Sequence, residues 1–257
     1  VVVNGVELTD LSEQELRPHR TQLQMIFQDP ISSLNPRRRV ADIVAEPLRV
    51  WGPHDEQEQI EIVDRMLHAV GLDPEVARDK RPHEFSGGQC QRISIARSLV
   101  LGPKVLICDE PVSALDVSVQ AQILNLLRDL KAEYGLTLVF IAHDLAVVKN
   151  VSDLVAVMYL GKLCEVAEPD DLYANAAHPY TSLLLESIPE PDPAATIDES
   201  VDLVGEIPSS IDPPSGCRFR TRCPHATEKC ENEEPQMREV SAGHHVACHH
   251  PLVAVAG

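Results

Sequence analysis

Basic and aromatic side chains are scarce in this chain of 257 residues. It has 22 Lys and Arg against 40 Asp and Glu, which gives a formal net charge of −18, and only 4% of its residues are aromatic. Proteins that bind nucleic acid place clustered Lys and Arg against phosphates and often stack bases on aromatic rings. We therefore expect no nucleic-acid partner. The negative charge does not exclude ATP, because backbone N–H groups and bound Mg²⁺ can hold its phosphates.

Long apolar runs are absent as well. No stretch approaches the roughly 20 apolar residues that a membrane-spanning helix needs. The opening Val1-Val2-Val3 is too short for the apolar part of a signal peptide and has no basic flank. We expect a cytosolic chain, whose seven cysteines are reduced thiols or metal ligands rather than a disulfide framework.

The sequence also lacks a phosphate-gripping loop. The pattern G-x-x-x-x-G-K-[ST] does not occur in it, and its nearest match, Gly161-Lys162, is followed by Leu163 and has no glycine five places earlier. In proteins with such a loop, its N–H groups and its Lys bind the β- and γ-phosphates. Without them, neighbouring carboxylates alone would bind a nucleotide poorly.

Apolar residues make up 44% of the chain, enough for a sizeable core, and their pattern alternates between strand and helix. The continuous apolar run at 105–108 and the largely apolar runs at 23–27 and 136–142 predict buried strands. Apolar residues at helical spacing predict helices at 60–70, 93–100 and 119–134. Strand–helix–strand alternation of this length indicates an α/β domain with a parallel sheet.

The chain after about residue 150 has a different character. Its expected elements are short strands at 154–159 and 162–168, a helix that opens at His178-Pro179-Tyr180-Thr181, a Pro-rich acidic linker at 189–200, and a polar tail from Gly205 that holds four Cys and many His.

Two carboxylates follow the strand predicted at 105–108. Asp109 and Glu110 would lie at the carboxyl edge of a parallel sheet, where such folds bind ligands. There Asp109 is suited to hold Mg²⁺ through water, and Glu110 to polarise a water that attacks a γ-phosphate. Taken alone, an Asp-Glu pair is more often an acidic loop after a core strand.

Other polar motifs stand at ordered distances from this pair. Ser86-Gly87-Gly88-Gln89 opens a helix upstream, so its backbone can approach a phosphate at a helix N-terminus. By themselves, a Ser-Gly-Gly sequence is often a flexible turn and a polar residue at a strand end is often structural. The remaining motifs are Ser113-Ala114-Leu115-Asp116 after the carboxylates, His143 at the end of the strand at 136–142, and Gln28 at the end of the strand at 23–27.

These five elements, in this order, resemble the nucleotide-binding subunits of ATP-binding cassette (ABC) transporters over nearly the whole chain. Ser86 to Gln89 matches the family signature, Asp109 and Glu110 the Walker B pair, and Ser113 to Asp116 the loop at the dimer interface. Gln28 and His143 match the Q-loop and the switch histidine. The chain resembles the oligopeptide/dipeptide importer branch in four further segments, 27–30, 33–36, 178–181 and 216–224. At Cys90 the wider superfamily often has Arg.

The resemblance implies a P-loop NTPase-type fold with a helical subdomain at about 40–100 and a Cys-rich C-terminal extension. It implies an ABC ATPase domain over 1–165 and an importer C-terminal region over 166–257. In the family the phosphate-binding loop precedes the strand seen here as Val1-Val2-Val3, so we expect the sequence to begin downstream of that loop.

The implied activity is ATP hydrolysis that powers oligopeptide or dipeptide import, with ATP and Mg²⁺. Without the phosphate-binding loop, this sequence by itself is expected to bind ATP poorly and to be inactive. The implied partners are a second ABC ATPase subunit, integral-membrane permease subunits and, indirectly, an extracytoplasmic peptide-binding protein. The implied location of this chain is the cytoplasmic face of the inner membrane, on its periphery. Two such subunits close head-to-tail, each signature loop completing the other's site. Two alternatives stay open: a fragment that only supplies its signature loop to a partner's ATP site, and a nucleic-acid-handling cassette protein, which the charge of −18 disfavours.

The tail holds Cys217, Cys223, Cys230 and Cys248 with the spacing C-x5-C-x6-C-x17-C. Several short spacings of thiolates suit an iron–sulfur cluster or zinc, and five His nearby also suit zinc. Some members of the importer branch carry a [4Fe–4S] cluster in this tail, so the resemblance favours iron–sulfur. Four ordinary reduced thiols are the remaining alternative.

Overall fold

The computed structural model describes residues 1–51, 55–187, 206 and 208–254. It divides the chain into two compact units, Val1–His143 and Asp144–Gly257. The linker predicted at 189–200 lies outside the described residues. The division into an ATPase domain over 1–165 and a C-terminal region over 166–257 stays a prediction.

A parallel sheet of β3 (Leu23–Ile26), β4 (Val105–Asp109) and β5 (Thr137–Ile141), in that order, organises the first unit. The three strands predicted at 23–27, 105–108 and 136–142 are confirmed as strands, but the prediction that all are buried is wrong for β5, where Val139 and Ile141 are 46% and 47% exposed. β4 lies in the middle, with Leu106 and Cys108 completely buried. Because the strands are parallel, their carboxyl ends meet at one edge, so the residues that follow β3, β4 and β5 become neighbours.

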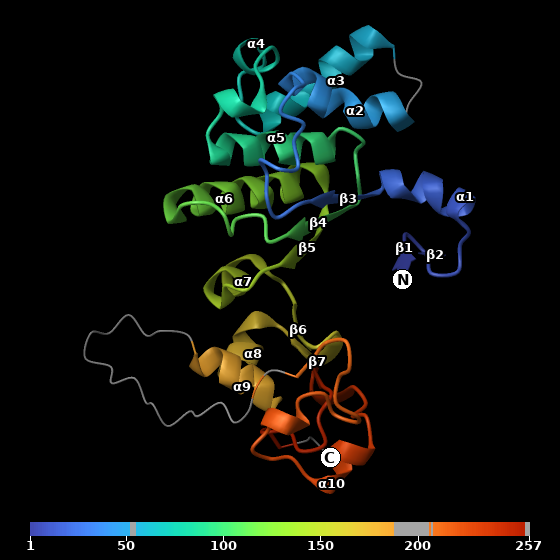
Figure 1. Ribbon diagram of the computed structural model, residues 1–257, viewed down its shortest axis with the longest axis vertical. Helices are drawn as coiled ribbons and strands as arrows, with labels where there is room; N and C mark the ends of the chain where they lie inside the picture. Colours follow the sequence, from blue (N-terminus) through green and yellow to red (C-terminus); the bar gives the residue numbers. More distant parts are fainter. Residues whose placement is uncertain (52–54, 188–205, 207, 255–257) are drawn as a thin grey trace, which may run out of the picture. The chain divides into compact units, whose positions relative to one another are not determined.

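Helices cover one side of this sheet (Figure 1). The signature helix α5 (Gly87–Leu99) packs against β3, α6, α2 and α3, and most of its residues are buried. Ile93, Ile95 and Ala96 are fully buried in the resulting core. The other helices of this layer are α2 (Val40–Trp51), α3 (Glu56–Ala69), α4 (Pro74–Ala77), a 3₁₀ turn at Pro82–Glu84, and α6 (Val117–Tyr134).

The start of the chain forms short elements. β1 (Val2–Val3) and β2 (Val6–Glu7) make a two-stranded antiparallel hairpin. α1 (Glu13–Leu16) begins with a capping box between Ser12 and Glu15, and a 3₁₀ helix (Arg17–Thr21) leads into β3.

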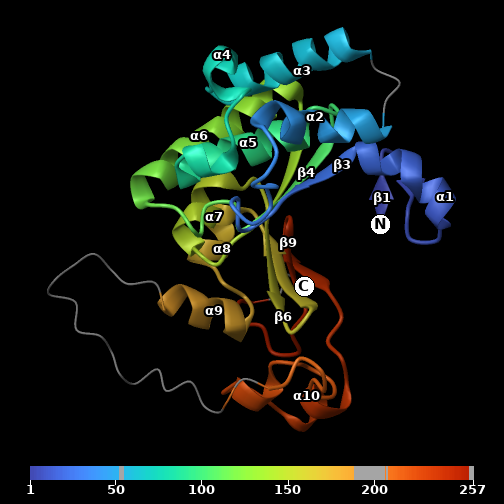
Figure 2. The ribbon, with the colours of Figure 1, turned by 45° about the horizontal axis from the view of Figure 1, so that its top comes forward.

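The second unit is built on an antiparallel sheet, drawn from yellow to red in Figure 2. Its strand order is β6-β7-β9-β8. The hairpin of β6 and β7 turns at Leu160 and Gly161, both with positive φ, and confirms the strands predicted around Gly161. The elements of this unit are α7 (Leu145–Val151), β6 (Val155–Tyr159), β7 (Lys162–Ala167), α8 (Pro169–Ala174), α9 (Pro179–Glu186), a 3₁₀ turn (Arg220–Arg222), α10 (Glu228–Asn232), β8 (Arg238–Ser241) and β9 (His244–Val246).

No helix in the described ranges is both long and apolar enough to cross a membrane.

Candidate nucleotide site

The carboxyl edge of the parallel sheet places Gln28, Glu110 and His143 around one carboxylate. Gln28 Nε2 donates a hydrogen bond of 2.8 Å to Glu110 Oε2. His143 Nδ1 lies 3.4 Å from the same oxygen, an ion pair when the imidazole is protonated. The Glu110 side chain is 25% exposed and that of His143 is 71% exposed, so the carboxylate is half-buried while its histidine partner is open to solvent.

The backbone of Glu110 is strained and firmly held. Its φ is +45°, in the left-handed region that costs an L-residue about 1–2 kcal/mol. Its N–H donates to the Ile141 carbonyl at 3.0 Å, and its own carbonyl accepts from the N–H and the hydroxyl of Ser113 at 3.2 and 3.0 Å. A strained residue that its surroundings fix in place is common at functional sites.

Asp109 and the loop after Glu110 flank this carboxylate. Asp109 is the last residue of β4, pairs in register with Ile141, and is half-buried. Asp116 is exposed and stands at the start of α6, where its carbonyl accepts from the Gln120 N–H at 2.8 Å. The Asp116 carboxylate makes no capping hydrogen bond to α6.

The signature residues form the start of α5. The Ser86 N–H donates to Gln89 Oε1 at 3.0 Å and the Gln89 N–H to Ser86 Oγ at 3.4 Å, which is a capping box. Gly88 is required by packing, because a Cβ there would lie 2.5 Å from Cγ1 of Val119 on α6. The hydrogen bonds of this motif stay within the helix start, separate from the cluster around Glu110.

The four cysteines of the tail line one small cavity, together with His225, His249 and His250. The Cys217 N–H donates to the Cys230 carbonyl at 2.8 Å. Burial raises the pKa of the thiols of Cys217 and Cys223, and raises that of Cys248 to about 11. Within the described part of the chain, however, no three His, Cys, Asp or Glu side chains are grouped so as to hold a metal ion. The expectation of an iron–sulfur cluster or zinc therefore gains no support from the structure.

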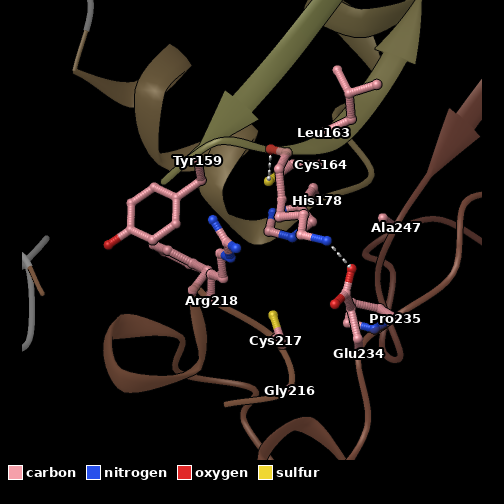
Figure 3. A pocket seen from close by; sticks show the side chains of 12 residues that line it. Tyr159, Leu163, Cys164, His178, Gly216, Cys217, Arg218, Glu234, Pro235 and Ala247 are labelled. Carbon is pink, nitrogen blue, oxygen red and sulfur yellow. Dashed lines mark hydrogen bonds and ion pairs between the residues drawn. The ribbon is translucent and has the colours of Figure 1, made fainter. Parts of the chain in front are cut away.

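A neighbouring cavity of about 50 Å³ joins residues that sequence reasoning did not connect (Figure 3). Cys164 and Cys217 both line it, and burial raises the pKa of the Cys164 thiol to about 12. His178 lines both cavities and caps α9, its Nδ1 accepting from the Tyr180 N–H at 3.0 Å. An ion pair of 2.7 Å between Lys162 and Glu234 closes one side.

The second unit also contains a buried charge cluster that the sequence did not reveal. His244, 1% exposed, lies between Glu165 and Asp171, with its two ring nitrogens 2.7 and 2.8 Å from their carboxylates. Glu165 Oε1 and Oε2 also accept from the N–H groups of Ala177 and His178 at 2.6 and 2.9 Å. This cluster holds β9, β7 and the helices α8 and α9 together and has no open position for a substrate.

A parallel sheet with two acidic residues at its carboxyl edge, a glutamine and a histidine on one of them, and a glycine-rich signature at a helix start defines a nucleotide-binding domain of the ABC type. The solved structure of cbiO1 from Clostridium perfringens, part of the ABC transporter complex cbiONQ, has a similar fold, with a TM-score of 0.61 and 32% identity over 67% of each chain. A second similar structure is the ATP-binding cassette MJ0796 in a dimeric, post-hydrolysis state with ADP and Pi. Its TM-score is 0.56 at 27% identity, over 65% of this chain and 72% of that one.

The family model for ABC transporters matches residues 1–113, and the model for the oligopeptide/dipeptide transporter C-terminal region matches residues 164–230. The oligopeptide transport ATP-binding protein OppF of Escherichia coli is 53% identical over 95% of this chain and 73% of its own. The putative oligopeptide transport ATP-binding protein YkfD of Bacillus subtilis is 51% identical over 97% of this chain and 76% of its own. The chain belongs to the ATP-binding subunits of the oligopeptide/dipeptide branch of ABC transporters.

Proposed function

We propose that this chain is the subunit that binds and hydrolyses ATP to power an ABC importer for oligopeptides or dipeptides. The observation that carries the proposal is the half-buried Glu110 carboxylate with Gln28 at 2.8 Å and His143 at 3.4 Å, on a backbone held at a φ of +45°. The alternative, a fragment that only supplies a signature loop, is not favoured, because relatives about half identical along nearly this whole chain are named ATP-binding transport proteins.

The residues at the sheet edge fit a Mg²⁺-bound triphosphate. Mg²⁺ prefers carboxylate oxygens and water, and neutralises charge on the transferring phosphate when bound. Asp109, half-buried at the end of β4, would hold it through water. Glu110 would polarise the attacking water and accept its proton, since its carboxylate lies at the sheet edge in contact with both a histidine and an amide. Gln28 would orient Glu110, and His143 would contact the γ-phosphate.

Ser86 to Gln89 would act on a partner's nucleotide rather than on this one. Their loop opens α5 with a capping box and two glycines, so N–H groups face outward at a helix N-terminus. Asp116, whose carboxylate is exposed at the start of α6, would contact the facing subunit. The proposed partners are a second ABC ATPase subunit, membrane permease subunits and, through them, an extracytoplasmic peptide-binding protein. The proposed location is the cytoplasmic face of the membrane, on its periphery.

The four-cysteine tail is a separate part of the proposal. Cys217, Cys223, Cys230 and Cys248 share one cavity, and an iron–sulfur cluster or zinc would have to draw their sulfurs together, since no three are grouped as ligands. No step of ATP hydrolysis depends on it. Metal analysis and the visible spectrum of anaerobically purified protein distinguish the outcomes: iron with sulfide, zinc, or neither, the last leaving four thiols.

Replacing Glu110 by Gln tests the central claim. The amide keeps the shape of the side chain but cannot accept the water's proton, so we expect ATP hydrolysis by the assembled transporter to fall by about 10²-fold or more, with ATP still bound. The phosphate release rate and the amount of trapped ATP measure the two effects. Undiminished hydrolysis would show that Glu110 is not the base. If ATP binding fell as much as the hydrolysis rate, the carboxylate would only support the fold.

A further inference from the structure

Two consecutive side chains of α5 hold the backbone on either side of Gln28. The Ser98 hydroxyl donates to the Met25 carbonyl of β3 at 3.1 Å. Arg97 Nη1 donates to the Ser33 carbonyl at 2.6 Å, across 64 residues of sequence. Gln28 lies between Met25 and Ser33 and is exposed, as are Phe27 and Asp29, so these two bonds hold both ends of the stretch that carries it.

The segment between Gln28 and Ser33 transmits this constraint because it is one folded turn. The Asp29 carboxylate accepts from the Ile31 and Ser32 N–H groups at 2.8 and 3.2 Å, and these bonds lower the pKa of that carboxyl. The Ser33 N–H donates back to the Asp29 carbonyl at 3.2 Å. A shift of Ser33 therefore moves Asp29, and with it the neighbouring Gln28.

Arg97 makes this bond at a cost that a neutral side chain would avoid. Its guanidinium is largely removed from water, which lowers the pKa of the group, and the charge of Glu46 acts in the opposite direction. Among the described residues, no carboxylate forms a salt bridge with Arg97. A desolvated cation without a salt-bridge partner is expensive, whereas its hydrogen bond to a carbonyl is stronger than a neutral one. The desolvation of Arg97 therefore accompanies one strong hydrogen bond, to the Ser33 carbonyl.

We propose that Arg97 is a positioning residue for ATP hydrolysis. It fixes the turn from Asp29 to Ser33 so that Gln28 reaches Glu110, and it ties that turn to the same helix that begins with the signature motif. The inference rests on the proposed ATPase function. It adds a second role for α5. The start of this helix would contact a partner's nucleotide, and Arg97, about three turns further along, would hold Gln28 of this subunit's own site.

Arg92 supplies a matched control on the same helix. It is also half-buried, and its Nη1 donates to a backbone carbonyl at 2.6 Å, but that carbonyl belongs to Val70 at the end of α3. Replacing Arg92 by Met removes a comparable bond without touching the turn that holds Gln28. Replacing Arg97 by Met removes the donor and keeps the apolar stem, and Arg97→Lys keeps a charged donor.

Hydrogen exchange on this chain tests the anchoring without any activity. In Arg97→Met we expect the amides of residues 31–34 to exchange about tenfold faster or more, the loss expected for one charged hydrogen bond. Arg97→Lys should recover part of the protection, and Arg92→Met should leave these amides unchanged. Unchanged exchange in a folded Arg97→Met protein overturns the proposal. If Arg97→Met does not fold, Arg97→Lys is compared with the wild type instead. Faster exchange of the amides of residues 31–34 in Arg97→Lys supports the proposal, and unchanged exchange overturns it.

Steady-state kinetics of the assembled transporter test the positioning. Arg97→Met should lower kcat about as much as Gln28→Ala does, with little change in the KM for ATP. The double variant should be no slower than Gln28→Ala alone, because Arg97 acts through that side chain. Losses that multiply, or a change confined to KM, refute it. Absence of hydrolysis in the wild-type transporter would instead defeat the proposed function, while the exchange experiment would still decide the anchoring.

Discussion

Gly216→Ala should damage the cysteine-rich segment far more than the same change at Gly243. Both glycines have positive φ, +60° and +75°, so alanine at either position costs about 1–2 kcal/mol of backbone strain. Only Gly216 is also crowded. A Cβ there would lie 2.4 Å from the Cys230 carbonyl oxygen and 2.7 Å from that of Glu231, whereas nothing lies within 4 Å at Gly243.

The crowding cannot be relieved cheaply, because both obstructing atoms belong to the backbone. The Cys217 N–H donates to the Cys230 carbonyl at 2.8 Å and the Ser215 hydroxyl to the Glu231 carbonyl at 3.1 Å, so moving the two strands of chain apart breaks these bonds. Overpacking of this kind adds about 1–3 kcal/mol. We therefore expect Gly216→Ala to lose about 2–5 kcal/mol and Gly243→Ala about 1–2 kcal/mol.

Thiol labelling is the sharpest assay, because Cys230 is only 6% exposed and lies at the crowded contact. Its labelling rate in native buffer should rise at least tenfold in Gly216→Ala relative to Gly243→Ala, since local opening becomes easier. Urea denaturation followed by circular dichroism gives the overall loss. Equal labelling rates and equal denaturation midpoints in the two variants would refute the argument, because the shared positive φ would then account for everything.

Two further perturbations follow from the structure. Gly88→Ala should lower the free energy of unfolding in urea by about 1–3 kcal/mol, since its Cβ would lie 2.5 Å from Val119 Cγ1. Adding Val119→Ala should restore part of the loss, and no restoration would mean that the contact is not the cause. Burial lowers the pKa of His178 from 6.5 to about 4, so its neutral form is favoured in the fold. Stability should therefore be complete above pH 6.5 and decline by about 3 kcal/mol as the pH falls to 4. His178→Asn, which keeps a capping oxygen, should show a weaker decline over that range, and an equal decline in both proteins would contradict the assignment.

The parallel sheet could be predicted from the sequence because its strands are rich in apolar residues, although in β5 these residues are less buried than the pattern predicts. The helix α2 was not predicted as an element, since Pro47 lies inside it and breaks the usual pattern of a helix interior. The strands β8 and β9 were missed for another reason. They are short, and Arg238, Glu239 and His244 give them little apolar alternation; β9 is buried through the ion pairs of His244, which only the folded chain brings together.

The candidate site could also be predicted from the pattern of the strands. Gln28, Glu110 and His143 each follow a predicted strand, and parallel strands end at one edge, so polar residues at their ends meet. Arg97 could not be given a role in this way. The sequence placed it only on the helix predicted at 93–100. Its partner is the backbone carbonyl of Ser33, and every residue has such an oxygen, so the sequence does not indicate which one Arg97 contacts.

The strain at Glu110 and the hold on Gln28 support the same conclusion. A glycine or asparagine at position 110 would adopt a φ of +45° more easily, yet the chain places a glutamate there and fixes its backbone through Ile141 and Ser113. Arg97 likewise gives up hydration to fix the turn beside Gln28. The first feature carries backbone strain and the second removes a guanidinium from water, and in the proposed scheme both restrict the 2.8 Å contact between the amide and the carboxylate. Under the proposed function both features would serve a preorganised carboxylate, because positioning that is fixed beforehand need not be achieved during the reaction.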